Sequence, residues 1–217
     1  MNWYVVVEGD SEKKIYKKWI PFVNPHMTYI DSLRLLTENN FYVISGGGYP
    51  NYLETIDDAI EDINSVGQFD RFIVVVDAEE MAFTEKQQEL IDYLSNRNIR
   101  AELYLIIQNF CIETWGLGNL KIAPRNPNSP TLQKYKNHYD VSVLDPEDLP
   151  KMGGLTRAQF AYKYLKAMLK DKHNHLYYTK RNPRALMHET FLHEIKKRYL
   201  NTNHIQSFKT FLEAVEN

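Results

Sequence analysis

Acidic side chains follow two Val-rich segments of the chain. The first segment is followed by Glu8-Gly9-Asp10-Ser11-Glu12, and the second is followed by Asp77-Ala78-Glu79-Glu80. Carboxylate oxygens are the ligands that the hard cations Mg²⁺ and Mn²⁺ prefer. Carboxylates held within a few ångströms of one another oppose folding unless a positive charge lies among them. The two motifs therefore predict an Mg²⁺ or Mn²⁺ site, whose candidate ligands are Glu8, Glu12, Asp77 and Glu79.

Such a site could activate a phosphodiester bond, because a divalent ion polarises a phosphate oxygen and lowers the pKa of a bound water. Each acidic residue also has a purely structural explanation. Glu12 is favourable near a helix N-terminus through the helix dipole. Asp77 could cap the turn after its strand, and Glu79 and Glu80 could be solvated. The combination of both motifs favours the metal site over these separate explanations.

The two Val-rich segments are predicted strands. Trp3–Glu8 and Phe72–Asp77 are short and rich in β-branched residues, as in a parallel sheet that is buried on both faces. Further strands are predicted at Phe41–Ser45 and Ala101–Ile107. Helices are predicted at Glu12–Ile20 (ending before Pro21), around Leu53–Ile63, at Thr84–Arg97 and at Phe110–Leu117. In the third of these helices, Leu90, Ile91 and Leu94 are expected to face inward.

This alternation predicts an α/β fold with a doubly wound, mostly parallel sheet flanked by helices. Ligand sites in such sheets form outside the carboxyl ends of the strands, where Glu8 and Asp77 are expected. Residues two apart in an extended segment point the same way, so Asp77 and Glu79 are expected to face one site together.

The C-terminal half has a different character. Residues 119–152 contain five prolines among polar residues, which predicts a long ordered loop with room for one edge strand. Helices are then predicted at Thr156–Lys170, Arg184–Leu200 and His204–Val215. We therefore expect an α/β core over residues 1–118 and, over residues 119–217, a loop-rich connection with C-terminal helices packed on that core.

The charge of the chain is unevenly distributed. Residues 1–150 hold 13 Lys and Arg against 23 Asp and Glu, and residues 151–217 hold 13 against 5, so balances of -10 and +8 make up the net charge of -2. An acidic part beside a basic part suits a metal site with a surface that holds a polyanion. Solvated helices that carry many Lys and Arg explain the basic part equally well.

Several protein classes are excluded by composition. Cys111 is the single cysteine, so neither an intramolecular disulfide nor a cysteine zinc cluster can form. No segment approaches the ~18 consecutive apolar residues of a membrane-spanning helix. The residues from Met1 to Tyr4 lead directly into a Val run without a basic region, so no secretion signal is expected. We expect a cytoplasmic protein that does not contact a membrane.

At these motifs the chain resembles a TOPRIM domain, the fold shared by topoisomerases, DnaG-type primases and overcoming-lysogenization-defect (OLD) nucleases. In that pattern a glutamate closes the first strand and D-x-D closes a later one. Glu8 matches the glutamate and Asp77 the first aspartate, whereas Glu79 replaces the second and lengthens that arm by a methylene. The resemblance is greatest to bacterial defence nucleases of the OLD and RloB-like type, whose first motif often reads E-G-x-[ST]-[DE].

The resemblance implies Mg²⁺- or Mn²⁺-dependent cleavage of nucleic acid, with DNA favoured over RNA, by an effector of phage defence. It implies that Glu113 is a further metal ligand, because Asn109–Trp115 is similar to a later segment of such proteins. It also implies that Lys180 holds the scissile phosphate. Glu8, Asp77, Glu79 and Lys180 are then the expected catalytic residues. An ABC-type ATPase partner is also implied, and it must be a separate chain because no G-x-x-x-x-G-K-[ST] motif is present.

Other features have less specific explanations. Arg181 and Arg184 join Lys180 as expected nucleic-acid-binding residues, although an exposed loop explains all three. Gly46-Gly47-Gly48 could present amides to a phosphate, but a tight turn after a strand is the favoured explanation. His173, His175, His188 and His193 lack the spacing of common zinc motifs. Trp3, Trp19 and Trp115 are expected in the core, as is a stripe formed by Phe160, Tyr164 and Met168.

Two other functions remain open. A regulatory or sensor subunit could keep the fold and bind nucleic acid or an ATPase without cutting, and Glu79 in place of aspartate is its main support. Nucleotidyl transfer, as in primases, ranks last because no further primase motif is present.

Overall fold

The computed structural model describes residues 1–172 and 177–216, which form two compact units. Unit 1 consists of Met1–Val76, Thr84–Ile107 and Thr210–Asn217, and unit 2 consists of Asp77–Phe83 and Gln108–Lys209. This partition differs from a single division at residue 118, because the chain leaves unit 1 twice and returns to it at its C-terminal end.

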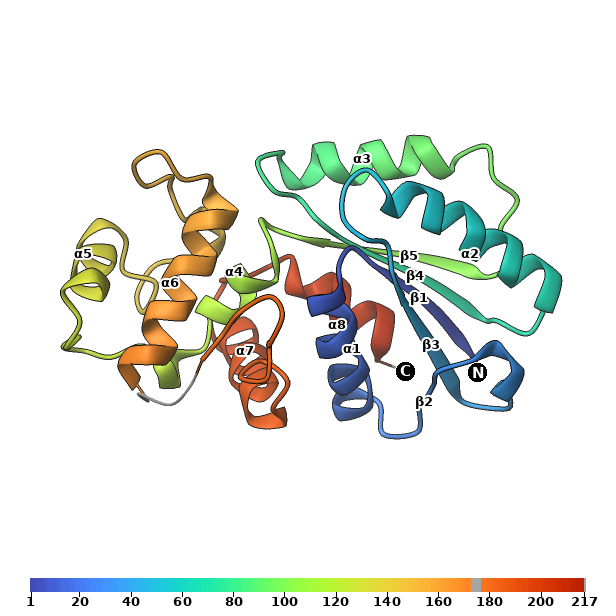
Figure 1. Ribbon diagram of the computed structural model, residues 1–217, viewed down its shortest axis with the longest axis horizontal. Helices are drawn as coiled ribbons and strands as arrows, with labels where there is room; N and C mark the ends of the chain where they lie inside the picture. The colour runs from blue at the N-terminus through green and yellow to red at the C-terminus, as the bar shows by residue number, and fades with distance from the viewer. Residues whose placement is uncertain (173–176, 217) are drawn as a thin grey trace. The chain divides into compact units, whose positions relative to one another are not determined.

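Unit 1 is built around a parallel sheet, as expected from the alternation of strands and helices. Its strands lie in the order β2-β3-β1-β4-β5, so β1 is central (Figure 1). Val5 of β1 pairs with Val43 of β3 on one side and with Ile73 of β4 on the other. The strands are β1 (Trp3–Val7), β2 (Thr28–Ile30), β3 (Asn40–Ser45), β4 (Arg71–Asp77) and β5 (Glu102–Gln108). The three-residue β2 was not predicted, because it is too short to show a periodic pattern.

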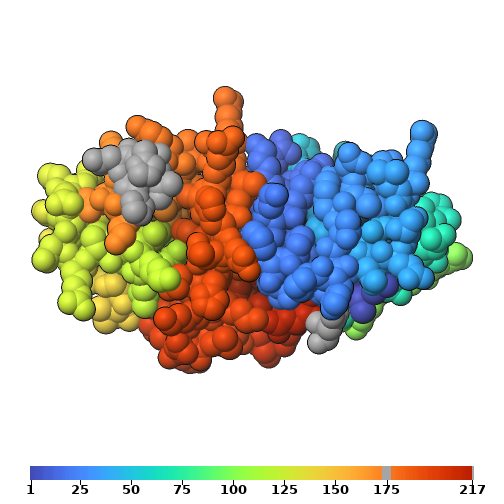
Figure 2. Space-filling model, turned by 90° about the horizontal axis from the view of Figure 1, so that it is seen from below, coloured from blue at the N-terminus to red at the C-terminus, as the bar shows by residue number. Residues whose placement is uncertain are grey.

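Helices cover both faces of the sheet, which confirms the doubly wound arrangement. Helices α2 (Tyr52–Val66) and α3 (Phe83–Leu94) lie on one face, and α1 (Asp10–Val23) and α8 (Phe208–Val215) lie on the other (Figure 1). The space-filling view in Figure 2 shows the side that carries α1, in blue. The ring of Phe211 lies 5.4 Å from that of Tyr16 and 5.7 Å from that of Trp19, between centroids.

Two details of unit 1 differ from the sequence predictions. Helix α1 continues through Pro21 to Val23, because Pro21 removes only its own hydrogen bond to the carbonyl four residues back and the buried Trp19 and Ile20 hold the last turns in place. Ile91 is 44% exposed, and the inward face of α3 is formed by Leu90 and Leu94, which lie one turn apart.

Unit 2 is mainly helical and confirms the helical C-terminal part. Helix α6 packs against α4 and α5, and the predicted stripe of Phe160, Tyr164 and Met168 is buried, with Phe160 and Tyr164 against Tyr135 of α5. Its helices are α4 (Ile112–Leu117), α5 (Pro130–His138), α6 (Arg157–Lys172) and α7 (Glu189–Asn201). No helix in the described part of the chain has the length and hydropathy needed to cross a membrane.

The Pro-rich connection contains a helix and, over its described length, no strand, so the expectation of an edge strand was wrong. The Ser129 hydroxyl accepts from the Leu132 N–H, and Pro130 occupies the first turn, where its missing N–H costs nothing. Helix α7 begins at Glu189 rather than Arg184, because Leu186 and Met187 donate to carbonyls three residues back in tight turns.

Candidate metal centre

A buried carboxylate lies at the start of α4 in unit 2. Glu113 is 1% exposed, and its Oε1 accepts a hydrogen bond of 2.7 Å from the Tyr178 hydroxyl. Its Oε2 has no hydrogen-bond partner among the described residues. Burying an ionised carboxylate is costly unless it is paired or coordinates a cation. Glu113 is therefore a candidate ligand for a cation.

Asp77, Lys180 and Glu113 all act on the thiol of Cys111. Burial raises the pKa of the Cys111 thiol well above its usual value, and the negative charges of Glu113 and Asp77 raise it further, while Lys180 opposes them. All three charged side chains therefore act on the same thiol. Cys111 itself is buried and stays protonated, so it contributes neither a nucleophile nor a thiolate ligand.

Backbone hydrogen bonds hold Asp77 beside the segment that leads into α4. The Ala78 N–H donates to the Gln108 carbonyl at 2.9 Å, and the Glu79 N–H donates to the Phe110 carbonyl at 2.8 Å. Asp77 itself is 5% exposed and is the last residue of β4. These bonds hold the chain just after Asp77 against the segment that precedes Glu113.

Glu79 does not continue the strand. Its φ is 53°, in the left-handed region, and its side chain is exposed, whereas Asp77 is buried. The expectation that the two side chains point the same way was based on extended backbone, which ends at Asp77. Glu79 stays a predicted ligand, without that geometric support.

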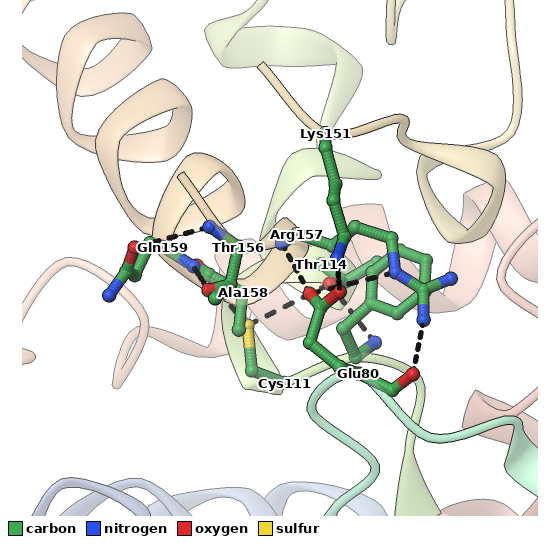
Figure 3. A network of polar contacts seen from close by, with 9 residues as sticks. Glu80, Cys111, Thr114, Lys151, Thr156, Arg157, Ala158 and Gln159 are labelled. Atoms are coloured by element: carbon green, nitrogen blue, oxygen red, sulfur yellow. Dashed lines mark hydrogen bonds and ion pairs between the residues drawn. The ribbon is translucent and has the colours of Figure 1, made fainter. Parts of the chain in front are cut away.

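Glu80 has a structural role instead of being solvated (Figure 3). Its Oε2 lies 2.6 Å from Lys151 Nζ, and its Oε1 accepts from the Arg157 backbone N–H at 2.6 Å. Burial alone would raise the pKa of Glu80, but Lys151 and Arg157 lower it. The carboxylate is therefore ionised and ties the segment after β4 to the N-terminus of α6, where the helix dipole favours negative charge.

The start of α6 is closed by a capping box, also visible in Figure 3. The Thr156 hydroxyl accepts from the Gln159 N–H, and the Gln159 side-chain oxygen accepts from the Thr156 N–H, each at 3.1 Å. The Arg157 guanidinium lies over the Phe110 ring, 3.9 Å from its centroid. Phe110 lies directly before Cys111 in the chain. The contact with Arg157 at the start of α6 therefore also holds the segment that carries Glu113.

In unit 1, a glycine turn holds the carboxyl end of β1. The Gly46 N–H donates to the Val7 carbonyl and the Gly48 N–H donates to the Glu8 carbonyl, each at 2.8 Å. Gly47 and Gly48 have φ of 72° and 87°, which favour glycine. These two amides are used inside the protein, which supports the tight-turn explanation over a phosphate cradle.

Glu12 folds back over Gly9 at the start of α1. The side chain of Glu12 is buried, and a Cβ added at Gly9 would lie 2.9 Å from its Oε2. The glycine of the E-G-x-x-E motif therefore leaves room for the second glutamate. This contact places Glu12 close to the residue that follows Glu8.

Lys86 is a candidate site residue that the sequence motifs did not include. It is 5% exposed, lies 3.1 Å from Glu89 Oε2, and faces the rings of Tyr49 and Tyr52. Burial raises the pKa of Tyr52, Lys86 lowers it, and Glu89 and Glu8 raise it, so Lys86 and Glu8 both act on this phenol. A lysine in register with Leu90 and Leu94 on the inward helix face was the available signal.

The predicted nucleic-acid-binding residues lie on the surface of unit 2. Lys180 and Arg181 are the central residues of a tight turn in which Thr179 and Asn182 exchange backbone hydrogen bonds of 3.3 and 2.9 Å. Both side chains and that of Arg184 are exposed. Of the four histidines, His188 and His193 are exposed, and His173 and His175 lie outside the described residues.

The donor set suits a hard cation held by few protein ligands. Within the described residues, no three His, Cys, Asp or Glu side chains are grouped as a metal site. Mg²⁺ is usually bound through one or two carboxylates, with waters and substrate phosphates completing its shell. Asp77 and Glu113 are two buried carboxylates of unit 2 that could serve in this way.

Comparisons with models of protein families, with curated proteins and with solved structures find no match for this chain.

Proposed function

We propose that the protein is an Mg²⁺- or Mn²⁺-dependent nuclease that hydrolyses phosphodiester bonds, with DNA favoured over RNA. The main support is the unpartnered, buried Oε2 of Glu113, whose charge acts together with that of Asp77 on the Cys111 thiol. A divalent cation beside these carboxylates would remove the cost of burying them and would supply Lewis-acid activation of a phosphate and of water.

The residues of the chain have distinct proposed roles. Asp77 and Glu113 hold the cation, and Glu8 stays a predicted ligand on the basis of its sequence motif. Lys180 binds the scissile phosphate from its exposed turn, and Arg181 and Arg184 bind neighbouring phosphates. The resemblance of the Glu8 and Asp77 motifs to TOPRIM domains supports the same roles and extends them to a phage-defence effector with a separate ABC-type ATPase partner.

A non-catalytic regulatory or sensor subunit is the second candidate. Lys180 acts on the same thiol as Glu113 and Asp77, so its ammonium could balance these carboxylates without a metal. The exposed Glu79, in left-handed backbone, departs from the D-x-D pattern. Such a subunit would bind nucleic acid or an ATPase and would take up no metal at these residues.

The two candidates are distinguished by cleavage and metal binding. Purified protein is incubated with supercoiled plasmid, linear DNA and RNA in Mg²⁺, in Mn²⁺ and in a chelator, and Mn²⁺ binding is measured by calorimetry. The nuclease is expected to cut only with metal, and Asp77→Asn and Glu113→Gln are expected to lower the rate by at least ~100-fold, in the range found for losing an electrostatic catalytic group.

Glu61→Gln is the matched control, because it removes one carboxylate from the exposed face of α2. It should cut at the parental rate. Cleavage by Asp77→Asn and Glu113→Gln at the parental rate contradicts the nuclease. Absence of Mn²⁺ binding together with retained nucleic-acid binding supports the regulatory subunit.

A further inference from the structure

A basic pocket lies between α5 and α6, within unit 2. Its volume is about 700 Å³, within the ~300–1,000 Å³ of small-molecule sites. Four of its lining residues are lysines: Lys163, Lys166, Lys170 and Lys172. None of the sequence motifs pointed to it, because these lysines look like the solvated face of a helix.

Among the described residues that line the pocket, Asp171 is the one acidic side chain, and its carboxylate accepts hydrogen bonds from the backbone. Asp171 accepts hydrogen bonds from the N–H groups of Asn128 at 3.0 Å and Ser129 at 2.7 Å, directly before α5. In the described part of the chain, none of the four lysines forms an ion pair with an acidic side chain. The pocket therefore keeps a net positive charge.

The lysines are arranged along one face of α6. Lys163, Lys166 and Lys170 are spaced i, i+3 and i+7, so consecutive side chains are neighbours ~5–6 Å apart at their Cβ atoms. Like charges at this spacing repel one another and weaken the helix. An anion with several negative oxygens would relieve this repulsion and could contact more than one lysine at once.

An aromatic ring completes the pocket. Tyr135 is half-buried, and its ring is held edge-on to Phe160 at 5.2 Å and against Tyr164 at 5.6 Å, between centroids. A fixed aromatic ring beside cationic side chains is the combination on which nucleobases stack while their phosphates are neutralised. Phosphate alone would need the lysines and not the ring.

We propose that this pocket binds the phosphates and base of a nucleotide, either as a free nucleotide or as the terminal residue of a nucleic-acid strand. Lys163, Lys166 and Lys170 contact the phosphates, and Tyr135 contacts the base. Binding here requires no metal and no cleavage, so it goes beyond the proposed nuclease activity and is tested separately from it.

The test is titration calorimetry in the presence of a chelator, with four probes: ATP, pyrophosphate, and a short single-stranded DNA with and without a 5′-phosphate. We compare the parent with Lys163→Ala/Lys166→Ala and with Lys134→Ala/Lys197→Ala. The second variant removes two exposed lysines that do not line the pocket, so both variants change the net charge equally. Thermal melting verifies that all three proteins are folded.

The pocket variant is expected to bind ATP at least ~10-fold more weakly than the parent, and the control variant to bind within ~2-fold of it. ATP bound as tightly as the oligonucleotides indicates a free nucleotide, and tighter binding of the 5′-phosphorylated strand indicates a strand end. Both results support the pocket.

The proposal is overturned if no probe binds. It is also overturned if the two double variants bind the probes with equal affinity. Asp77→Asn should bind every probe as the parent does. A protein that binds nucleotide but never cuts nucleic acid would disprove the proposed nuclease and leave this pocket in place. A protein that cuts nucleic acid but binds no probe would disprove the pocket and leave the nuclease in place.

Discussion

At the scale of single residues, the most informative atom is Oε2 of Glu113. Glu113 is 1% exposed and its Oε2 has no hydrogen-bond partner among the described residues, whereas buried polar atoms normally have one. The Tyr178 hydroxyl donates to Oε1, which makes that hydroxyl important for stability as well as for orientation.

Tyr178→Phe is therefore expected to lower the free energy of unfolding by ~1–3 kcal/mol, because it leaves a buried carboxylate oxygen without its donor. The ring is retained, so packing changes little. Urea unfolding measures the loss.

A double-mutant cycle provides the control. In a Glu113→Leu background the tyrosine hydroxyl has lost its acceptor, so Tyr178→Phe should cost nothing there or should stabilise. An equal loss in both backgrounds would mean that the hydroxyl acts through some other group.

At the scale of secondary-structure elements, the ends of strands and helices are fixed by very local chemistry. Gly46 allows the turn after β3 to approach α2, since a Cβ there would lie 2.4 Å from the Tyr52 Cβ and 2.7 Å from its Cα. The capping box of Thr156 and Gln159 fixes the start of α6. Both features support residues of the candidate site without belonging to it.

Gly46→Ala is expected to destabilise the protein by ~1–3 kcal/mol, as overpacking against backbone does. Gly154→Ala is the matched control, because a Cβ at Gly154 meets no atom within 4 Å, and it should stay within ~0.5 kcal/mol of the parent. Urea unfolding of both variants gives the comparison. Equal stability of the two would show that the β3–α2 turn can move away from α2.

Thr156→Ala is expected to cost ~0.5–2 kcal/mol through loss of the N-cap of α6. Thr156→Ser keeps the hydroxyl and should retain most of the stability. Thermal melting compares the two variants, and a serine variant as unstable as the alanine variant would assign the effect to the lost methyl group instead of the cap.

At the scale of the whole molecule, stability should depend on pH through Glu147. Its carboxylate accepts from the Ser207 N–H at 3.1 Å and from the Ser207 hydroxyl, but burial dominates and raises its pKa from 4.5 to about 7. The folded state therefore holds this proton over a pH range in which the unfolded chain has lost it. Stability should fall as the pH rises from about 4.5 to about 7 and stay low above that.

One pKa unit corresponds to about 1.4 kcal/mol, so the rise from 4.5 to about 7 amounts to a loss of up to ~3 kcal/mol at alkaline pH. Glu147→Gln cannot ionise and still accepts from Ser207. It should be more stable than the parent at pH ~8 and similar to it at pH ~5 in urea unfolding. A parent and variant that differ equally at both pH values would exclude titration of Glu147 as the cause.

The sequence by itself determined the parallel α/β sheet and most helices of both units. Continuous Val-rich runs such as Trp3–Val7 can be buried only between two layers of helices, and a stripe such as Phe160, Tyr164 and Met168 can face only a core, so local pattern and burial coincide. The positions of Glu8 and Asp77 at strand ends followed from the same pattern.

The tertiary structure decided which polar groups are satisfied. The contacts of Glu80 with Lys151 and Arg157 and the unpartnered oxygen of Glu113 depend on residues distant in the chain, which no local pattern specifies. The pocket between α5 and α6 likewise exists only when two helices meet, because a lysine face looks the same in sequence whether it borders solvent or a cavity.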